Sequence, residues 1–202
     1  MVIKNEQILD AAAEALAKRP DATLQSIAKA AGISRTTIFH RYPTRDELLE
    51  ALGKDTLERI GLVMARVPNE EVGDVAAVMS EVTRGLMPLG PRTVFLRVVP
   101  GWGNGLDEHW ESAVTPLAVY VHMAQALGML RADQPARWLT ASYIGLLFAA
   151  WDEVAKGELG TAQAARLVVQ TWSAGCVYAP DYGHLRAAAA SGGSQGGHLG
   201  LD

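Results

Sequence analysis

Hydrophobic residues recur at helical spacing along most of the chain. Near the N-terminus, Ile8, Ala12 and Leu16 share one face of a predicted helix, and Leu24 and Ile27 begin the apolar face of a second. No segment shows the alternation of apolar and polar residues that is typical of a strand. The pattern therefore predicts an all-α protein.

Start and stop signals divide the rest of the chain into further helices. The sequence Thr44-Arg-Asp-Glu47 is typical of a capping box, and the helix that it opens is expected to end near Arg66. A weaker helix should end at Leu86, before a segment rich in proline and glycine at 88–105. Longer helices are predicted over 107–130, where Pro116 kinks or splits the helix, and over 135–156 and 161–178.

The segment from Thr23 to Pro43 has the spacing of two short helices joined by a tight turn. Ala28 is small enough for close contact where the helices cross, and Gly32 can adopt the positive φ that the turn needs. Ser34 is a good N-cap for the second helix. The wedge between the helices is filled by Ile27, Ile33 and Ile38. This pattern predicts a helix-turn-helix; the alternative is a small helical corner with a solvated basic face.

The second of these helices carries side chains suited to reading DNA. In the major groove, Arg35 at its start can bind a guanine in bidentate fashion, and Thr36 or Thr37 can meet a thymine methyl group or a phosphate. Phosphate contacts are expected farther along the chain, from His40, Arg41 and Arg45. A double-stranded DNA operator is the partner that this arrangement predicts.

Charge and cysteine content fit a DNA-binding protein of the cytoplasm. The first 45 residues hold seven basic and four acidic side chains, a net charge of +3, whereas the remainder carries −7. The lone Cys176 excludes an internal disulfide and favours a reducing compartment. The N-terminus lacks a signal-peptide pattern, and the longest apolar run, at 138–151, is too short to span a bilayer. We therefore expect no membrane association.

The N-terminal quarter of the chain closely resembles the tetracycline-repressor (TetR) family. The first helix, Ile8-Leu-Asp-Ala-Ala-Ala, is similar to the family's, and the pattern Thr-x-x-x-Ile-Ala-x-x-Ala-Gly-Ile-Ser follows at 23–34. Thr37-Ile-Phe-His-Arg-Tyr and Pro43-Thr-Arg-Asp-Glu-Leu continue the resemblance. The similarity covers about residues 3 to 52.

The resemblance implies operator contacts at individual positions of this chain. Phe39 stands where the family usually has tyrosine, which removes a hydroxyl that often meets a phosphate, and Thr36 stands where a small residue is common. Arg41 can compensate electrostatically for the lost hydroxyl. The implied contact residues are Thr23, Ser26, Arg35, Thr36, Thr37, Phe39, His40 and Arg45.

The last two predicted helices are apolar nearly all round, with Trp138, Leu147 and Trp172 among their side chains. A helix without a polar face needs partners on both sides. In a chain of 202 residues an inner core and a second copy of the chain can supply them; a large monomeric core is the alternative. The homodimer, which the resemblance also implies, would place two helix-turn-helix units on a palindromic or nearly palindromic operator.

The resemblance also implies a cavity for a small-molecule effector whose binding changes the spacing of the two helix-turn-helix units. Aromatic side chains with occasional polar tips suit such a pocket, although ordinary core packing is the alternative for each of them. The candidate ligand-binding residues are Trp102, His109, Trp110, Tyr120, Met123, Tyr143, Phe148 and Trp151.

No pattern in the sequence is typical of an enzyme, and we expect no cofactor, catalytic residue or metal site. His109 lies beside Asp107, Glu108 and Glu111, but helical spacing does not gather all four on one face. The predicted organisation is a three-helix DNA-binding domain at 1–48, a helical ligand-binding and dimerisation domain at 49–186, and a flexible tail at 187–202. The predicted function is a regulator, most simply a repressor released by a ligand; the alternative is a helical ligand-binding or interaction protein without operator binding.

Overall fold

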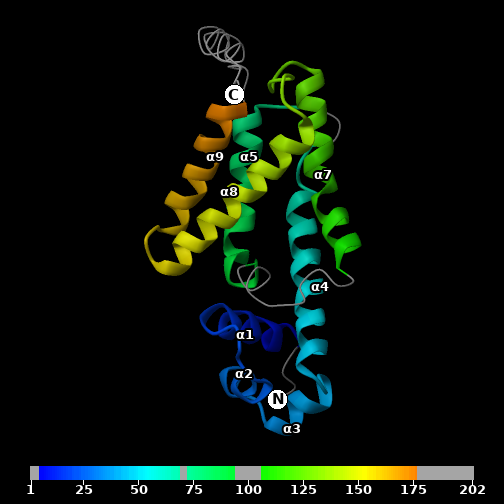
Figure 1. Cartoon of the computed structure of the whole chain (residues 1–202), viewed down its shortest axis with the longest axis vertical. Helices are drawn as coiled ribbons and strands as arrows, with labels where there is room; N and C mark the ends of the chain where they lie inside the picture. Colours follow the sequence, from blue (N-terminus) through cyan, green and yellow to red (C-terminus); the bar gives the residue numbers. More distant parts are fainter. Residues whose placement is uncertain (1–4, 69–71, 94–105, 177–202) are drawn as a thin grey trace, which may run out of the picture.

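The computed structural model describes residues 5–68, 72–93 and 106–176 of the chain, and its regular elements in this part are helices. The all-α prediction is therefore confirmed. Three helices at one end of the molecule form a small unit, called the head below (Figure 1). They are α1 (Asn5–Lys18), α2 (Leu24–Ala30) and α3 (Arg35–Arg41).

A long helix, α4 (Arg45–Met64), leads from the head into the larger helical unit, called the body below (Figure 1). Its end lies close to the predicted one, and Pro116 lies inside α7 without splitting it. The segment 94–105, the predicted end at 178 and the tail at 187–202 lie outside the described residues. The body contains α5 (Val75–Leu86), the 3-10 turn η1 (Met87–Leu89), α7 (Asp107–Ala126), α8 (Ala136–Lys156) and α9 (Thr161–Cys176).

The N-terminal caps explain where several helices begin. The Ser34 hydroxyl accepts a hydrogen bond from the Thr37 backbone N–H at 3.0 Å and caps α3. At α4 the Thr44 hydroxyl accepts from the Glu47 N–H at 3.2 Å and donates to the Glu47 carboxylate at 3.0 Å. The predicted cap at Thr44 is therefore present. In a capping box the Glu47 carboxylate would accept from a backbone N–H, whereas here it accepts from the Thr44 hydroxyl.

The turn between α2 and α3 depends on one glycine. Gly32 has φ of 68°, in the left-handed region that side chains with a Cβ adopt at a cost. Ala28, on α2, is 2% exposed at the crossing, and Ile27 and Ile38 are fully buried beside it. Ile33 is partly buried against the same cluster. The predicted wedge of isoleucines therefore exists.

Two hydrophobic cores hold the described residues, and α4 contributes to both. Its Leu48 and Leu52 belong to the core of the head, with Ile8, Leu16 and Ile38. From Leu57 onward the apolar residues of α4 belong to the core of the body. The boundary expected at residue 48 falls within this continuous helix, so head and body share a rigid rod.

In the body, α4 packs along α7, α8 packs along α9, and α5 packs against α9. Trp172 lies at the centre of this arrangement, where its indole N–H donates to the Leu139 carbonyl at 2.9 Å. The Tyr143 ring meets the indole edge to face at 5.8 Å. Among the described residues, no helix combines the length and apolarity needed to cross a bilayer.

The positive φ at Gly32 yields a stability prediction. Gly32→Ala should lower the free energy of unfolding by about 1 kcal/mol, because an L-residue is strained in the left-handed region although space for a methyl group exists there. Gly175→Ala in α9, which also meets nothing within 4 Å but has no positive φ, is the matched control and should not destabilise the chain. Denaturant unfolding followed by circular dichroism measures both; equal effects would contradict the role of the turn.

Candidate functional site

Several of the predicted contact residues cap the two helices of the helix-turn-helix. Thr23 accepts a hydrogen bond from the Ser26 N–H at 3.2 Å, and the Ser26 hydroxyl donates to the Thr23 carbonyl at 2.8 Å. The hydroxyls of Ser34 and Thr37 lie 2.8 Å apart at the start of α3. Thr23, Ser26 and Thr37 therefore fix the ends of α2 and α3, and they do so at the exposed end of the head.

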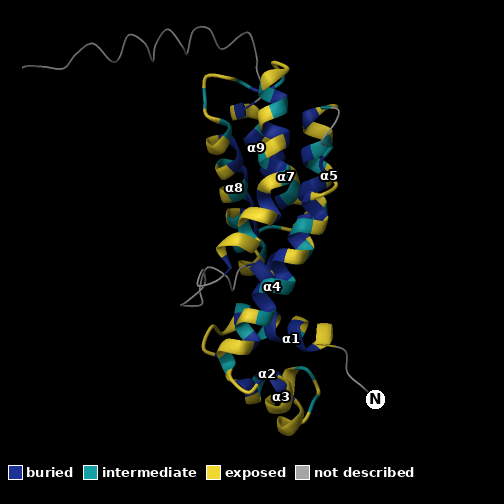
Figure 2. Cartoon of the chain, turned by 90° about the vertical axis from the view of Figure 1, so that its right-hand side faces the viewer, coloured by how far each residue is buried: buried dark blue, intermediate teal, exposed yellow. Residues whose placement is uncertain are grey.

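The outward face of α3 carries four of the side chains that are predicted to contact DNA. Arg35, Thr36, Phe39 and His40 are all exposed, and α3 lies at the far end of the head from the body (Figure 2). Arg35 and Phe39 are one helical turn apart, and the guanidinium lies 5.3 Å from the ring centroid. The ring thus holds the guanidinium along the surface of α3.

Arg41 lies at the other end of α3 and is tied to α1. Its Nη1 donates to the Asn5 Oδ1 at 3.2 Å, and the Tyr42 hydroxyl donates to the same oxygen at 2.5 Å. Burial is the main cause that raises the pKa of Tyr42, so its phenol stays protonated and remains a donor. Asn5 and Tyr42 were not among the predicted site residues, because no local spacing signals a bond between positions 37 residues apart.

The Arg45 side chain makes hydrogen bonds that the sequence did not indicate. Its Nη2 donates to the Pro20 carbonyl at 2.6 Å and its Nε donates to the Ala22 carbonyl at 3.3 Å. Both carbonyls belong to the connection between α1 and α2. The side chain predicted to bind phosphate thus braces this connection, which precedes the cap at Thr23.

An apolar pocket lies in the body beside α4. Its volume is about 290 Å³, a figure that includes the solvent space at its open mouth. The rings of Trp110 and Phe148 are inclined by 30° with centroids 6.5 Å apart, and the Phe148 and Trp151 rings meet edge to face at 5.3 Å. The lining residues are Ile60, Met64, Leu86, Trp110, Val114, Ile144, Leu147, Phe148 and Trp151.

The structure brings three of the predicted ligand-binding residues to this pocket, namely Trp110, Phe148 and Trp151. Trp102 lies outside the described residues. The other four do not line the pocket: His109 is exposed, Met123 is half-buried, and Tyr120 and Tyr143 are buried.

The two buried tyrosines belong to the core of the body. The Tyr143 hydroxyl lies 2.8 Å from the Thr83 hydroxyl, which itself donates to the Met79 carbonyl. Burial raises the pKa of Tyr120 to about 12 and raises that of Tyr143, so both phenols are neutral at physiological pH. In the part of the chain that is described, no cluster of three His, Cys, Asp or Glu side chains is arranged to hold a metal ion.

Sequence reasoning missed the whole aliphatic wall of the pocket. Ile60 and Met64 come from α4, Leu86 from α5 and Val114 from α7. Each of these residues has the ordinary pattern of a core position, so their sequence contains no signal that separates a pocket wall from close packing. The packing of α4, α7 and α8 decides that difference.

Comparison with known proteins agrees with this architecture. The pattern of the family described as "Bacterial regulatory proteins, tetR family" matches residues 8–52. The HTH-type transcriptional repressor LfrR of Mycolicibacterium smegmatis is 37% identical over 93 residues, which are 46% of this chain and 49% of LfrR, about half its length. The HTH-type transcriptional regulator NfxB of Pseudomonas aeruginosa is 26% identical over 175 residues, 84% of this chain and 92% of NfxB.

The fold comparison extends over both head and body. The crystal structure of the TetR-like regulator LfrR from Mycobacterium smegmatis in complex with proflavine superposes with a TM-score of 0.70 at 25% identity, covering 86% of this chain and 96% of LfrR. The helix-turn-helix head joined to an all-helical body is thus similar to the architecture of a TetR-like transcriptional regulator. Residues 8–52 match the TetR family, as the sequence motifs predicted, and the fold of the chain is similar to that of a TetR-like regulator.

The different surroundings of Arg35 and Arg45 yield a prediction about the head. Arg35→Ala should leave the free energy of unfolding unchanged but relax the preference at one base pair by about 1 to 3 kcal/mol. Arg45→Ala should lower the free energy of unfolding by about 1 kcal/mol, because two loop carbonyls lose a charged donor. Thermal unfolding and binding to a panel of single-base operator variants separate the two effects. Full stability of Arg45→Ala would contradict its bracing role.

Proposed function

We propose that the chain is a transcriptional repressor that binds a palindromic operator as a homodimer and is released by a flat aromatic effector. The observation that carries the proposal is the outward face of α3. There Arg35, Thr36, Phe39 and His40 project from the end of the head, on a helix whose ends are fixed by capping bonds. Such a helix fits the major groove, where arginine and threonine can contact base edges. We propose no catalysed reaction for this chain. We also propose that it acts in the cytoplasm, where the operator DNA lies.

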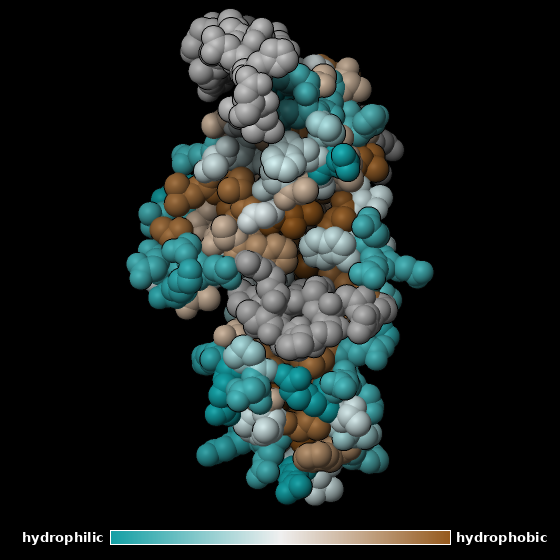
Figure 3. Space-filling view, in the orientation of Figure 1, coloured by the Kyte–Doolittle hydropathy of each residue, from teal (hydrophilic) through white to brown (hydrophobic). Residues whose placement is uncertain are grey.

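The surface of α8 and α9 supports a homodimer. Hydrophobic side chains gather on the face of the body where these helices lie (Figure 3). Trp138 of α8 is 59% exposed and Leu167 of α9 is 42% exposed. α8 also exposes Ala141, Gly145 and Ala149, spaced four residues apart, and such small residues permit close helix packing. A second copy of the same face would complete a symmetric bundle of four helices.

The pocket and α4 together support control by an effector. Ile60 and Met64 line the pocket from α4, and the same helix carries the core residues Leu48 and Leu52 of the head. A ligand that fits one position of α4 better than another would shift the position of the heads. LfrR is known in complex with proflavine, a flat aromatic cation. In this chain the rings of Trp110 and Phe148 could stack against a ligand of that kind.

The dimer and the palindrome can be tested together. Selection from random duplex DNA should recover a palindromic site, and analytical ultracentrifugation should give a dimer at micromolar concentration. The Leu167→Glu variant should be monomeric and should no longer select a palindromic site, because the substitution places a charge in the apolar dimer face. Its helical content should not change.

Leu127→Glu is the matched control, because Leu127 is 66% exposed at the end of α7 and belongs to neither α8 nor α9. This variant should stay dimeric. Recovery of no palindrome by the parent chain would contradict the repressor proposal and would favour a helical ligand-binding protein that does not bind an operator.

The pocket can be tested with proflavine as the probe. Trp110→Ala should weaken proflavine binding about tenfold, because one stacking surface is lost. His109→Ala, one residue earlier on α7 but exposed, should bind as the parent does. Fluorescence titration measures both affinities. A loss at His109 with none at Trp110 would place the ligand elsewhere.

A further inference from the structure

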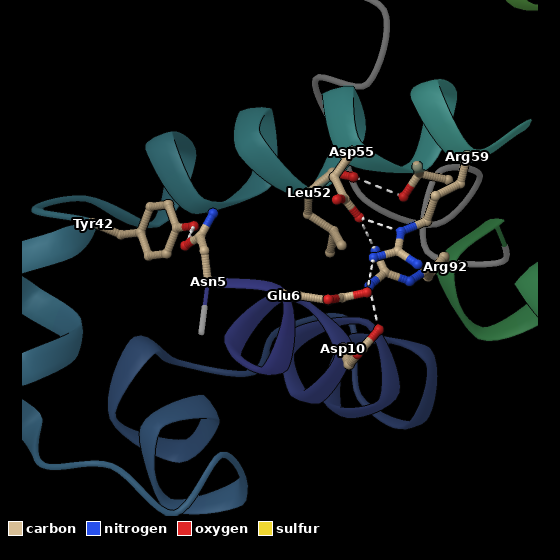
Figure 4. A network of polar contacts seen from close by, with 9 residues as sticks. Asn5, Glu6, Asp10, Tyr42, Leu52, Asp55, Arg59 and Arg92 are labelled. Atoms are coloured by element: carbon tan, nitrogen blue, oxygen red, sulfur yellow. Dashed lines mark hydrogen bonds and ion pairs between the residues drawn. The ribbon is translucent and has the colours of Figure 1, made fainter. Parts of the chain in front are cut away.

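A cluster of charges joins the head to the body where α1 passes beside α4 (Figure 4). Arg92, which is 5% exposed, donates from Nη1 to the Asp55 Oδ2 at 2.5 Å and from Nη2 to the Asp10 Oδ1. Arg59 donates from Nε to the same Asp55 oxygen at 2.9 Å and from Nη2 to the Glu6 Oε1 at 2.7 Å. Two arginines from outside the head thus bind two carboxylates of α1.

The two arginines differ in burial. Only 6% of the Arg92 side chain is exposed, whereas 30% of the Arg59 side chain is. A buried guanidinium is screened little by salt, and its planar fork fixes both carboxylates in direction as well as distance. Arg92 therefore restrains the position of α1 relative to α4 more strongly than Arg59 does.

The other end of the same backbone turn touches the pocket. Residues 90–93 are helical, and the Thr93 hydroxyl donates to the Gly90 carbonyl at 3.0 Å within this turn. A Cβ placed on Gly90 would lie 2.9 Å from Cδ1 of Trp151, a residue that lines the pocket. Trp151 thus rests directly on the backbone that carries Arg92 two residues later. One short rigid turn separates the pocket wall from the ion pair with α1.

We propose that residues 90–93 couple the pocket to the head, with Arg92 as the positioning residue. In this arrangement a movement of Trp151 displaces Gly90, the displacement moves the Arg92 guanidinium, and α1 loses or changes its ion pair at Asp10. The head angle, meaning the orientation of the head relative to the body, is set by Arg92 whether or not a ligand is bound. The response to a ligand rests on the proposed function of the pocket.

The head angle can be measured without DNA or effector. Spin labels on Lys29→Cys in α2 and Glu81→Cys in α5, both exposed positions, report the distance between head and body by double electron–electron resonance. Cys176 is replaced by alanine in all chains, and an excess of unlabelled chain dilutes the labelled one so that only distances within one chain are measured. The parent chain should give one narrow distribution.

Asp10→Asn should broaden or shift this distribution, because Arg92 loses its charged partner on α1. Glu14→Gln is the matched control, one turn farther along α1, exposed, and with the same change of charge. Arg92→Gln should change the distance distribution in the same way as Asp10→Asn. If Arg92→Gln fails to fold, Asp10→Asn still tests the ion pair, because Asp10 is half-exposed. Identical distributions for the parent, Asp10→Asn and Glu14→Gln would overturn the positioning role.

Gly90→Ala tests the pocket end of the turn. The added methyl group should press on Trp151 and shift the distance distribution without any ligand. With proflavine, the parent should lose operator affinity at least about fivefold, and Asp10→Asn should keep its affinity for proflavine but lose most of this response.

The outcomes distinguish the two proposals. If Gly90→Ala leaves the distances unchanged, or if Asp10→Asn keeps the full response, the coupling is overturned. If the parent binds neither operator nor proflavine, the proposed function fails, while the distance measurements still decide whether Arg92 positions the head.

Discussion

The shared use of α4 by two hydrophobic cores is the constraint on which the rest of the structure depends. Leu48 and Leu52 anchor the start of this helix in the head, and its apolar residues from Leu57 onward are buried in the body. An α-helix bends little over this length, so a change in the packing of its second half must move its first half. Any ligand that alters the packing of Ile60 or Met64 therefore acts on the helix that carries the reading head.

Within the head, polar side chains divide into those that build it and those that remain available. Thr23, Ser34 and Arg45 satisfy backbone groups at the helix starts and at the connection between α1 and α2. Their bonds hold α3 at the tip of the molecule, where Arg35 and Phe39 lie on its outer face. The precision of a DNA contact depends on this division, because a reading side chain is only as well placed as the helix beneath it.

The junction between head and body combines an apolar and a polar restraint. Trp151 packs on the backbone at Gly90, and Arg92 holds Asp10 and Asp55. Apolar packing fixes how close the elements approach, whereas the guanidinium fork fixes their direction. The buried charge is stable here because carboxylates from two helices accept its hydrogen bonds.

The sequence by itself determined the helices, the helix-turn-helix and the resemblance of the head to the TetR family. The signals for these lie within a few residues of one another: the caps at Ser34 and Thr44, the positive φ at Gly32, and the helical spacing of apolar side chains. Local backbone chemistry decides such features without the help of long-range contacts. Trp110, Phe148 and Trp151 could also be named for the pocket, because large aromatic side chains are few in this chain.

Only the tertiary structure decided where long side chains end and which faces meet. Arg45 reaches carbonyls 23 and 25 residues away, and Arg92 reaches a carboxylate 82 residues away. The same packing placed His109 at the surface and Tyr143 in the core, although both were expected at the pocket. Such contacts depend on how α1, α4 and α8 pack together, and that packing is set by both cores at once rather than by the residues beside each position.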